Sequence, residues 1–419
     1  MIDLMLNWSE WIKPSAGLPT VQWALLLALA AAAGHLLQRY LGLPKVLGYS
    51  AVGALAGFSG YTTASWPLDG IAQFMVELGL SIVLFEAGGR LSLRWFRHNP
   101  MLLVQSLGES LATYLAAWWV LQLFGVDEAL QIPLALLLVA TSPTVLMRVA
   151  SDLRASGPVT DRVITLAALN TFYVLSLGGV MARLLGRSPA TLADAIYPVI
   201  LLVVASVLIG ALLALALRKA LEIMSPTSEN TAVLQLSLIA AGTALATHFG
   251  GSAPLAALLA GILLKTLHPR PWSWPRQFGT ASAILTILMF VLVSMAAAQA
   301  DWNWQAWSLM AALVLARALA KLGAIAVTGW GSGTSLKQAL WTASALWPLS
   351  AVALLLVSQF AEFAPHIGEQ VAALALPLIL FMEVLGALMT MLALQRAGEA
   401  GRPPATRRIK PEGENNDAA

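Results

Sequence analysis

The sequence contains no cysteine and few charged residues. Its 419 residues include no Cys, and Asp, Glu, Lys and Arg together make up 11%, whereas a soluble globular chain carries about 25% charged residues. The lack of cysteine excludes disulfides and thiolate metal sites, and it leaves the compartment open. The shortage of charge means that most of the chain faces something other than water. The mean hydropathy of +0.77 indicates lipid.

Signatures of catalysis and of nucleic-acid binding are also missing from the sequence. His98, His248, His268 and His366 lie near the ends of apolar runs, and no two are spaced as a metal pair. There is no Gly-rich phosphate loop and no nucleophile motif. The net charge of +3 is scattered between apolar runs instead of forming a basic patch. We therefore expect no enzyme, no metal, no cofactor and no nucleic-acid partner.

Long apolar runs fill most of the chain. They are Leu- and Ala-rich, continuous and roughly 18 to 25 residues long, which matches a membrane helix and exceeds a barrel strand. They predict an all-α integral membrane protein with an N-terminal segment at 1–20, a transmembrane domain at 21–395 and a disordered tail at 396–419. The thirteen predicted spans are 21–38, 46–62, 70–89, 101–125, 129–150, 160–182, 195–217, 231–248, 252–268, 278–298, 303–328, 338–360 and 370–395.

The basic residues indicate how these runs are oriented, because cytoplasmic segments of membrane proteins are enriched in Lys and Arg. If the N-terminus is outside, 19 of the 24 Lys and Arg residues fall in cytoplasmic segments, 3 fall outside and 2 lie within a span. A miscounted run would scramble this alternation. We expect a multi-pass protein of the cell (inner) membrane, with the N-terminus in the periplasm and the C-terminus in the cytoplasm.

Charged residues inside the predicted spans are the first candidates for a functional site. Arg317 and Lys321 are four residues apart on one helix, so both cations point the same way. In an apolar span they need an acidic partner, helix C-termini or a water-filled cavity. Glu86 lies beside Arg90, so it is either a site residue or a snorkelling carboxylate. Glu77, Glu109 and Glu383 also fall within spans, and the first two are equally interpretable as interhelical hydrogen-bond partners.

Proline interrupts two of the predicted spans near their middles. The fifth span contains Thr141, Ser142 and Pro143, and the twelfth contains Pro348 and Ser350. When spans 1–6 and 8–13 are taken as two repeats, both interrupted spans are the fifth of their repeat. This placement is typical of inverted-repeat transporters with broken crossing helices. Two ordinary proline kinks are the alternative. We take these residues as candidate site residues.

The sixth span carries an Asn170-Thr171 pair at mid-depth, next to the predicted break of the fifth span. Such a pair either supplies ligands to a site or hydrogen-bonds between packed helices. We include both residues among the candidates.

Several longer motifs occur in a characteristic order. They are LGLPKVLGYSAVGALAG and MVELGLSIVLFEAGGRLSL in the second and third predicted spans, then GGSAPLAALLAGILL, ARALAKLGAIAVTG and LFMEVLGALMTMLAL in later ones. Together they resemble the monovalent cation:proton antiporter superfamily, which has the sodium/proton antiporter fold with inverted repeats. The resemblance covers nearly the whole transmembrane region.

By this resemblance, Thr141, Ser142 and Pro143 match the break in the family's fifth helix. Asn170 and Thr171 match its sixth-helix Asn-Asp or Asp-Asp pair, but the aspartate that binds the cation and protons is absent. Half-helix N-termini, each worth about half a positive charge, converge at the site in this fold. Without the aspartate, we expect a more positive centre.

The missing aspartate requires another titratable group, because Ser and Thr do not titrate. Arg317 and Lys321 would add to the positive charge of the centre. Glu86 is expected to replace the aspartate, since some branches of the family use a glutamate in a matching segment of the third helix. Glu77 and Glu109 are weaker substitutes.

The resemblance implies a secondary-active transporter that exchanges a monovalent cation, Na⁺ or K⁺, for protons across the lipid bilayer. Glu86 would supply charge, and the fifth and sixth spans would supply oxygen ligands. Two alternatives stay open: an anion carrier of the same fold, which would use Arg317 and Lys321, and a non-transporting sensor or assembly subunit. The resemblance also implies a homodimer.

Overall fold

The structure is a computed structural model that describes residues 18–60, 66–68, 70–91, 99–186, 192–225, 228–267, 276–300, 306–349 and 351–401. These residues form helices joined by short turns, and the described ranges contain no strand. The elements are α2 (Leu18–Leu36), the π-helical turn η1 (Leu37–Leu41), α3 (Lys45–Phe58), α4 (Gly70–Arg90), α6 (Met101–Leu123), α7 (Glu128–Val139), α8 (Pro143–Leu153), α9 (Pro158–Leu185), α10 (Leu192–Ile223), α11 (Glu229–His248), α12 (Ala253–Leu267), α13 (Arg276–Ala298), α14 (Ala306–Gly329), the 3-10 turn η2 (Trp330–Ser332), α15 (Leu336–Ala345), α16 (Ala351–Phe363) and α17 (Pro365–Arg396).

Each predicted span coincides with one of these helices, except that the two proline-containing spans are each split into a pair. Nine stretches of the described residues are long and apolar enough to cross a membrane by length and composition. The prediction of an all-helical, membrane-spanning chain is therefore confirmed. The number of crossings and the segment at 1–20, of which residues 1–17 lie outside the described residues, stay predictions.

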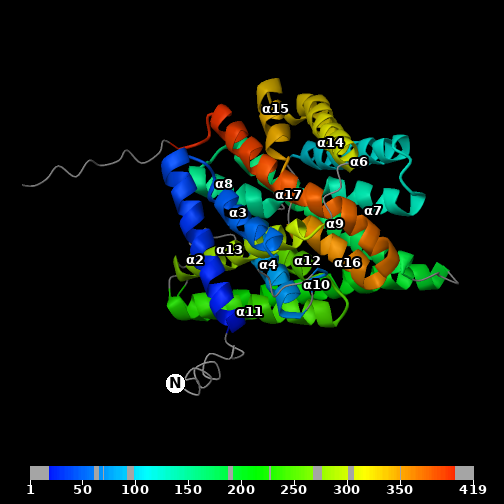
Figure 1. The fold of residues 1–419 in the computed structure, drawn as a ribbon. Helices are drawn as coiled ribbons and strands as arrows, with labels where there is room; N and C mark the ends of the chain where they lie inside the picture. The colour runs from blue at the N-terminus through cyan, green and yellow to red at the C-terminus, as the bar shows by residue number, and fades with distance from the viewer. Residues whose placement is uncertain are drawn as a thin grey trace, which may run out of the picture.

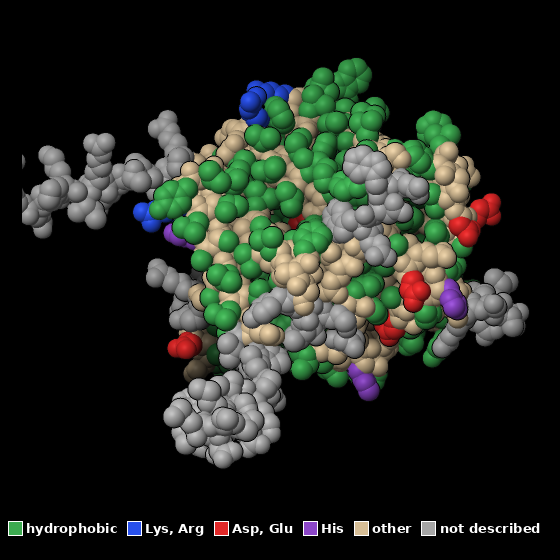
Figure 2. All heavy atoms as spheres, viewed as in Figure 1, with side chains coloured by type: hydrophobic (Ala, Val, Ile, Leu, Met, Phe, Trp, Pro, Cys, Tyr) green, Lys and Arg blue, Asp and Glu red, His purple; other side chains and the backbone are tan. Residues whose placement is uncertain are grey.

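The outer surface of the helices is largely apolar. Hydrophobic side chains cover much of the face shown in Figure 2, and most of its charged side chains lie toward the edges. Large exposed residues such as Leu208 on α10 and Leu319 on α14, which are 63% and 60% exposed, would be unfavourable in water. In a bilayer these side chains face lipid of matching polarity.

The helices form two groups that pack mainly among themselves. We call α2, α3, α4 and α10–α13 the scaffold group, and α6–α9 with α14–α17 the crossing group. In Figure 1, α6, α14 and α15 lie together at the upper right, whereas α2, α11 and α13 lie toward the lower left. Both interrupted helices, and the helix that carries Arg317 and Lys321, belong to the crossing group.

Glycines allow a close contact between α4 and α12 in the scaffold group. A Cβ atom added to Gly88 would lie 2.4 Å from the Leu258 carbonyl oxygen, and one added to Gly261 would lie 2.2 Å from that of Phe85. Small residues let helix backbones approach closely in membranes, where packing takes the place of the hydrophobic effect. This contact fixes the position of α4 in the scaffold.

Both broken helices stop where the sequence places proline, and their breaks meet. Proline lacks an N–H and disrupts the helical ladder, so α7 ends at Val139 and α8 begins at Pro143. Ser142 caps α8, because its Oγ accepts a hydrogen bond from the Val145 N–H (3.3 Å). The Ser142 N–H donates to the carbonyl oxygen of Pro348, in the other break, at 2.9 Å. The two unwound segments are therefore joined directly.

A polar link joins the two groups where α8 meets α3. The Asp152 carboxylate on α8 accepts a hydrogen bond from the Lys45 N–H at the start of α3 (3.1 Å) and lies 3.6 Å from Lys45 Nζ. Arg148 on α8 donates to the hydroxyl of Tyr49 on α3 at 2.8 Å. A carboxylate at a helix N-terminus is favourable. The link stabilises the arrangement of the two groups described here.

The residues directly after α17, which fall within the predicted tail at 396–419, contact the start of α9 and the end of α8. The Glu399 carboxylate accepts hydrogen bonds from the N–H groups of Val159 (2.8 Å) and Thr160 (2.7 Å) and from the Thr160 hydroxyl (2.7 Å). The Gly401 N–H donates to the Leu153 carbonyl at 3.0 Å. A carboxylate satisfies the otherwise unpaired donors at the start of α9, which composition alone does not reveal. Residues 402–419 lie outside the described residues.

We expect Glu399→Gln to lower the free energy of unfolding by about 1–2 kcal/mol, because the start of α9 loses a charged cap. Thermal unfolding of the detergent-solubilised protein measures the change. Glu369→Gln is the matched control, since Glu369 is an exposed glutamate near the other end of α17. Equal melting temperatures for Glu399→Gln and the parent protein would contradict the capping role.

Candidate functional site at the helix crossing

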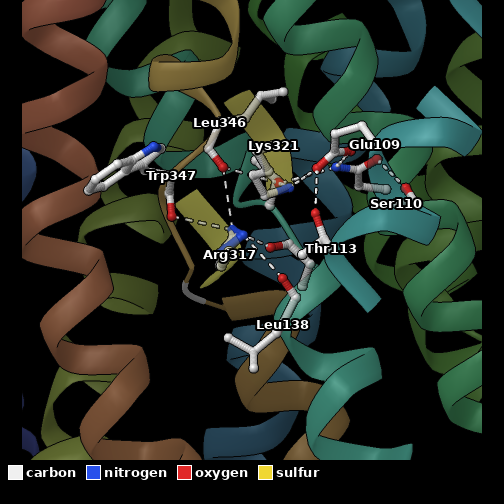
Figure 3. Close-up of polar contacts among 11 residues, drawn as sticks. Glu109, Ser110, Thr113, Leu138, Arg317, Lys321, Leu346 and Trp347 are labelled. Carbon is white, nitrogen blue, oxygen red and sulfur yellow. Dashed lines mark hydrogen bonds and ion pairs between the residues drawn. The ribbon is translucent and has the colours of Figure 1, made fainter. Parts of the chain in front are cut away.

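Arg317 binds the ends of both interrupted helices. Its side chain on α14 is fully buried. Nη1 donates to the Leu138 carbonyl at 3.1 Å, and Nη2 donates to those of Ala140 (2.7 Å), Leu346 (3.3 Å) and Trp347 (3.3 Å). Figure 3 shows the guanidinium between the two chain breaks. These carbonyls have no partner within their own helices, so one side chain satisfies the ends of α7 and α15 together.

The charge of Arg317 also matches that of the two helix ends. A helix C-terminus carries roughly half a negative charge, so two such ends amount to about one negative charge. One guanidinium cancels them. Of the three kinds of partner predicted for this cation, the structure provides helix C-termini.

Lys321, one turn further along α14, forms a buried ion pair with Glu109 on α6. Both side chains are 0% exposed, and Nζ of Lys321 contacts Oε1 of Glu109. The ammonium group also donates to the Thr141 hydroxyl at 3.2 Å. Figure 3 shows the two charged side chains pointing toward each other. Of the three kinds of partner predicted for Lys321, the structure provides an acidic side chain.

Asn170 connects this ion pair to the break of the α7–α8 helix. Its Nδ2 donates to Oε2 of Glu109 at 2.9 Å and to the hydroxyl of Thr141 at 3.2 Å, while its Oδ1 accepts from Ser110 at 3.0 Å. Thr113 also donates to Glu109 Oε1, at 3.4 Å. The carboxylate of Glu109 therefore receives hydrogen bonds from two helices besides its ion pair. Such donors stabilise an ionised carboxylate in a buried site.

The structure brings most of the other predicted candidates to the crossing, in backbone or capping roles. Thr171 donates to the Ala167 carbonyl at 2.8 Å and to the Thr141 carbonyl at 3.5 Å. Pro143 is the first residue of α8, and the Pro348 carbonyl accepts the hydrogen bond that joins the two breaks. Ser350 lies outside the described residues.

Glu86 takes part in none of the hydrogen bonds described around Lys321. Its carboxylate pairs with Arg90 at 3.0 Å, four residues further along α4, and its side chain is 25% exposed. It lines a cavity of about 200 Å³ together with Thr144 and Arg148 of α8. The hydroxyl of Thr144 lies 2.8 Å from that of Ser142, so this cavity reaches the start of α8. The ion pair with Arg90 favours the interpretation of Glu86 as a snorkelling carboxylate over that of a site residue.

The structure places Glu109, which the sequence analysis took as a weaker substitute than Glu86, beside Lys321. The sequence did carry one signal, because two buried cations on α14 need an acidic partner and Glu109 is one of few intramembrane glutamates. The structure also corrects the expectation that Arg317 and Lys321 make the centre more positive. Arg317 is balanced by helix ends, and Lys321 is balanced by Glu109. Within the described part of the chain, no three His, Asp or Glu side chains are placed to hold a metal.

Comparisons with solved structures find the same fold in known proteins. The chain's fold is similar to that of the sodium proton antiporter MjNhaP1 from Methanocaldococcus jannaschii in a structure at pH 8, with a TM-score of 0.67 and 17% identity. An electron-microscopy structure of the same antiporter gives a TM-score of 0.69 at 16% identity. Each match covers 90% of this chain and 98% of the other. The predicted all-helical sodium/proton antiporter fold is thereby confirmed, whereas the inverted repeats and the number of spans stay predictions.

The search of curated proteins gives no significant match to the sequence. The family profile described as "Sodium/hydrogen exchanger, transmembrane" matches residues 24–395, which is nearly the whole described chain. These residues include both broken helices and the buried pair of Glu109 and Lys321. The chain belongs to the sodium/hydrogen exchanger family of membrane proteins.

Proposed function

We propose that this protein exchanges a monovalent cation, Na⁺ or K⁺, for protons at the helix crossing. The observation that carries the proposal is the fully buried pair of Glu109 and Lys321 beside Thr141 and Asn170. It supplies a carboxylate and a proton-bearing ammonium group at the crossing, although α9 has no aspartate in its Asn170-Thr171 pair. Family membership supports cation:proton exchange in general, and the choice of cation belongs to this proposal.

Charge balance in the buried site explains why cation binding would release a proton. A cation that enters beside Glu109 would leave two positive charges facing one carboxylate, which is costly in a buried site. If Lys321 gives its proton to water, the entering cation takes the place of that charge. Glu109 then binds the cation, with the hydroxyl oxygen of Thr141 as a neighbouring ligand. One cation enters and one proton leaves.

Two cavities near opposite ends of α4 support alternating access to this site. The cavity of about 200 Å³ contains Glu86, near the end of α4, and reaches Thr144 at the start of α8. A second cavity of about 120 Å³ contains Glu77 of α4 and reaches Leu175 of α9, one helix turn beyond Thr171. We assign the first to the cytoplasmic side, because the basic side chains of Lys and Arg gather there.

Purified protein in proteoliposomes tests the proposal. With an imposed pH gradient and a pH-sensitive dye inside, Na⁺ or K⁺ should dissipate the gradient, whereas choline should not. Empty liposomes are the control for leakage. No response to Na⁺, K⁺ or Li⁺ at any pH from mildly acidic to alkaline would refute the proposed exchange.

An anion carrier of the same fold is not favoured by the geometry. It would need a cation available to bind the anion, but both candidates are already engaged by negative partners. Arg317 binds four carbonyl oxygens, and Lys321 binds Glu109. An anion would have to displace these partners within a buried site.

A further inference from the structure

A second buried carboxylate lies outside the candidate site. Glu383 on α17 is 0% exposed, and its Oε1 accepts hydrogen bonds from the hydroxyls of Ser50 on α3 and Ser294 on α13, the latter at 3.1 Å. The helix α17 belongs to the crossing group, whereas α3 and α13 belong to the scaffold group. Both of these hydrogen bonds therefore cross the interface between the groups.

Glu383 is fixed to the interrupted helix on its own side of the interface. One turn further along α17, a Cβ atom added to Gly386 would lie 2.4 Å from the Cα of Pro348, so the two backbones are in contact. The Thr390 hydroxyl donates to the Ala345 carbonyl at 3.0 Å, at the end of α15. These contacts couple Glu383 to the break, and a displacement of the crossing group carries both.

The ionised and the protonated forms of the Glu383 carboxyl group respond differently to a displacement of the crossing group. An ionised carboxylate away from water needs hydrogen-bond donors, and Ser50 and Ser294 supply two of them in this arrangement. A shift by one helix turn, about 5.4 Å, would separate Glu383 from both hydroxyls. The protonated form is neutral and has a donor of its own, so it tolerates the separation better.

We propose that Glu383 is a second proton-binding site, which takes up one proton when the crossing group moves away from α3 and α13 and releases it on return. The proposal rests on the proposed function, because it assumes that the two groups move during transport. The only bond that forms and breaks is the O–H bond of the carboxyl group. The proton comes from the aqueous phase on one side and leaves to that on the other.

Other ionisable groups surround α17, and they need to be separated from Glu383 in any test. Tyr49 is next in sequence to Ser50, a partner of Glu383. The Tyr49 hydroxyl accepts a hydrogen bond from Arg148. The part of α13 between Gly279 and Ala298 has no ionisable side chain. The helices packed against α17 carry Lys45 and Tyr49 (α3), Glu128 (α7), Arg148 and Asp152 (α8), Arg317 and Lys321 (α14), Lys337 (α15) and Glu362 (α16), and α17 itself carries His366, Glu369 and Arg396.

Infrared difference spectra of the purified protein between two pH values test proton binding without transport. We expect the carboxylic C=O band of the parent protein to lose one component in Glu383→Gln. Ser50→Ala/Ser294→Ala should enlarge this component at a given pH, because the ionised form loses both hydroxyl donors. Ser81→Ala, which changes a buried serine of α4, is the matched control and should leave it unchanged. An unaltered band in folded Glu383→Gln overturns the proposal.

The coupling is tested by the ion gradient at which proton flux reverses in proteoliposomes. We expect Glu383→Gln to exchange one proton fewer per cation than the parent protein, and an unchanged ratio overturns the proposal. If the variant transports nothing, the infrared result alone decides whether Glu383 binds a proton. Absence of flux in the parent protein refutes the proposed function instead, so the two failures are distinguishable.

Discussion

Replacing Glu109 by glutamine is expected to lower the rate of cation-dependent proton movement by roughly 100-fold or more. The amide cannot balance a cation, and Lys321 loses its counter-charge in a site that is 0% exposed. Dissipation of a pH gradient in proteoliposomes measures the effect. Glu86→Gln is the matched comparison on α4 and should retain exchange, because Glu86 pairs with Arg90. The opposite ranking of these two variants would restore the sequence-based assignment to Glu86.

Loss of folding has to be separated from loss of exchange in this experiment. Removing one partner of a buried ion pair costs about 3–5 kcal/mol, so Glu109→Gln alone should be less stable. The double variant Glu109→Gln/Lys321→Gln removes both charges, and we expect it to recover most of that stability while remaining inactive. Cation-dependent exchange in the double variant would show that the pair is structural.

Replacing Arg317 by methionine should cause a large loss of stability, of the same order as that expected for Glu109→Gln. The substitution leaves carbonyl groups at the ends of both α7 and α15 without their donor, and each buried unsatisfied group costs about 1–3 kcal/mol. We expect a total loss above about 3 kcal/mol, or no recoverable folded protein. Arg317→Lys should be intermediate, because an ammonium lacks the planar fork that reaches both chain breaks.

Thermal unfolding and size-exclusion profiles in detergent measure this effect. Arg218→Met is the control, since Arg218 lies on α10 in a partly exposed pair with Glu222 at 2.9 Å. Exposed pairs contribute about 0–1 kcal/mol, so the control should unfold nearly as the parent protein does. An Arg317→Met variant as stable as the control would mean that other donors satisfy these carbonyls.

The positions of the helix breaks could be predicted because proline acts locally. Pro143 and Pro348 remove backbone donors wherever they stand, and their matching places in the two halves indicated a crossing. The need of Arg317 and Lys321 for negative partners could also be predicted, because an unpaired buried cation is costly in any arrangement. Each of these inferences depends on a few neighbouring residues.

The identity of the partners could not be predicted, because it depends on how the helices are rotated and packed. Glu77, Glu86 and Glu109 are all glutamates within apolar spans, so the sequence does not tell them apart. Only the packing of α6 against α14 places Glu109 beside Lys321. The partners of Arg317 are backbone carbonyls, which have no side-chain signature. A local pattern favoured Glu86, but that pattern also fits the helical pair with Arg90 that the structure contains.

The position of Glu109 suggests how an exchanger of this fold operates without the usual aspartate. The resemblance to cation:proton antiporters places the carboxylate on the sixth span, where this chain has Thr171. Glu109 reaches the same region from α6, and Asn170 of α9 donates to it at 2.9 Å. On the proposed function, the charge is therefore supplied by a neighbouring helix while the break and its hydroxyls keep their places.

The contacts of residues 399–401, directly after α17, bear on how the protein is best tagged for expression. The Glu399 carboxylate accepts three hydrogen bonds from the start of α9, the helix that also carries Asn170. A fluorescent reporter fused directly after Arg396 would delete this carboxylate and displace the chain from the α8–α9 corner. A reporter fused beyond Gly401 keeps the native contacts, so expression screens should truncate the chain no earlier than that residue.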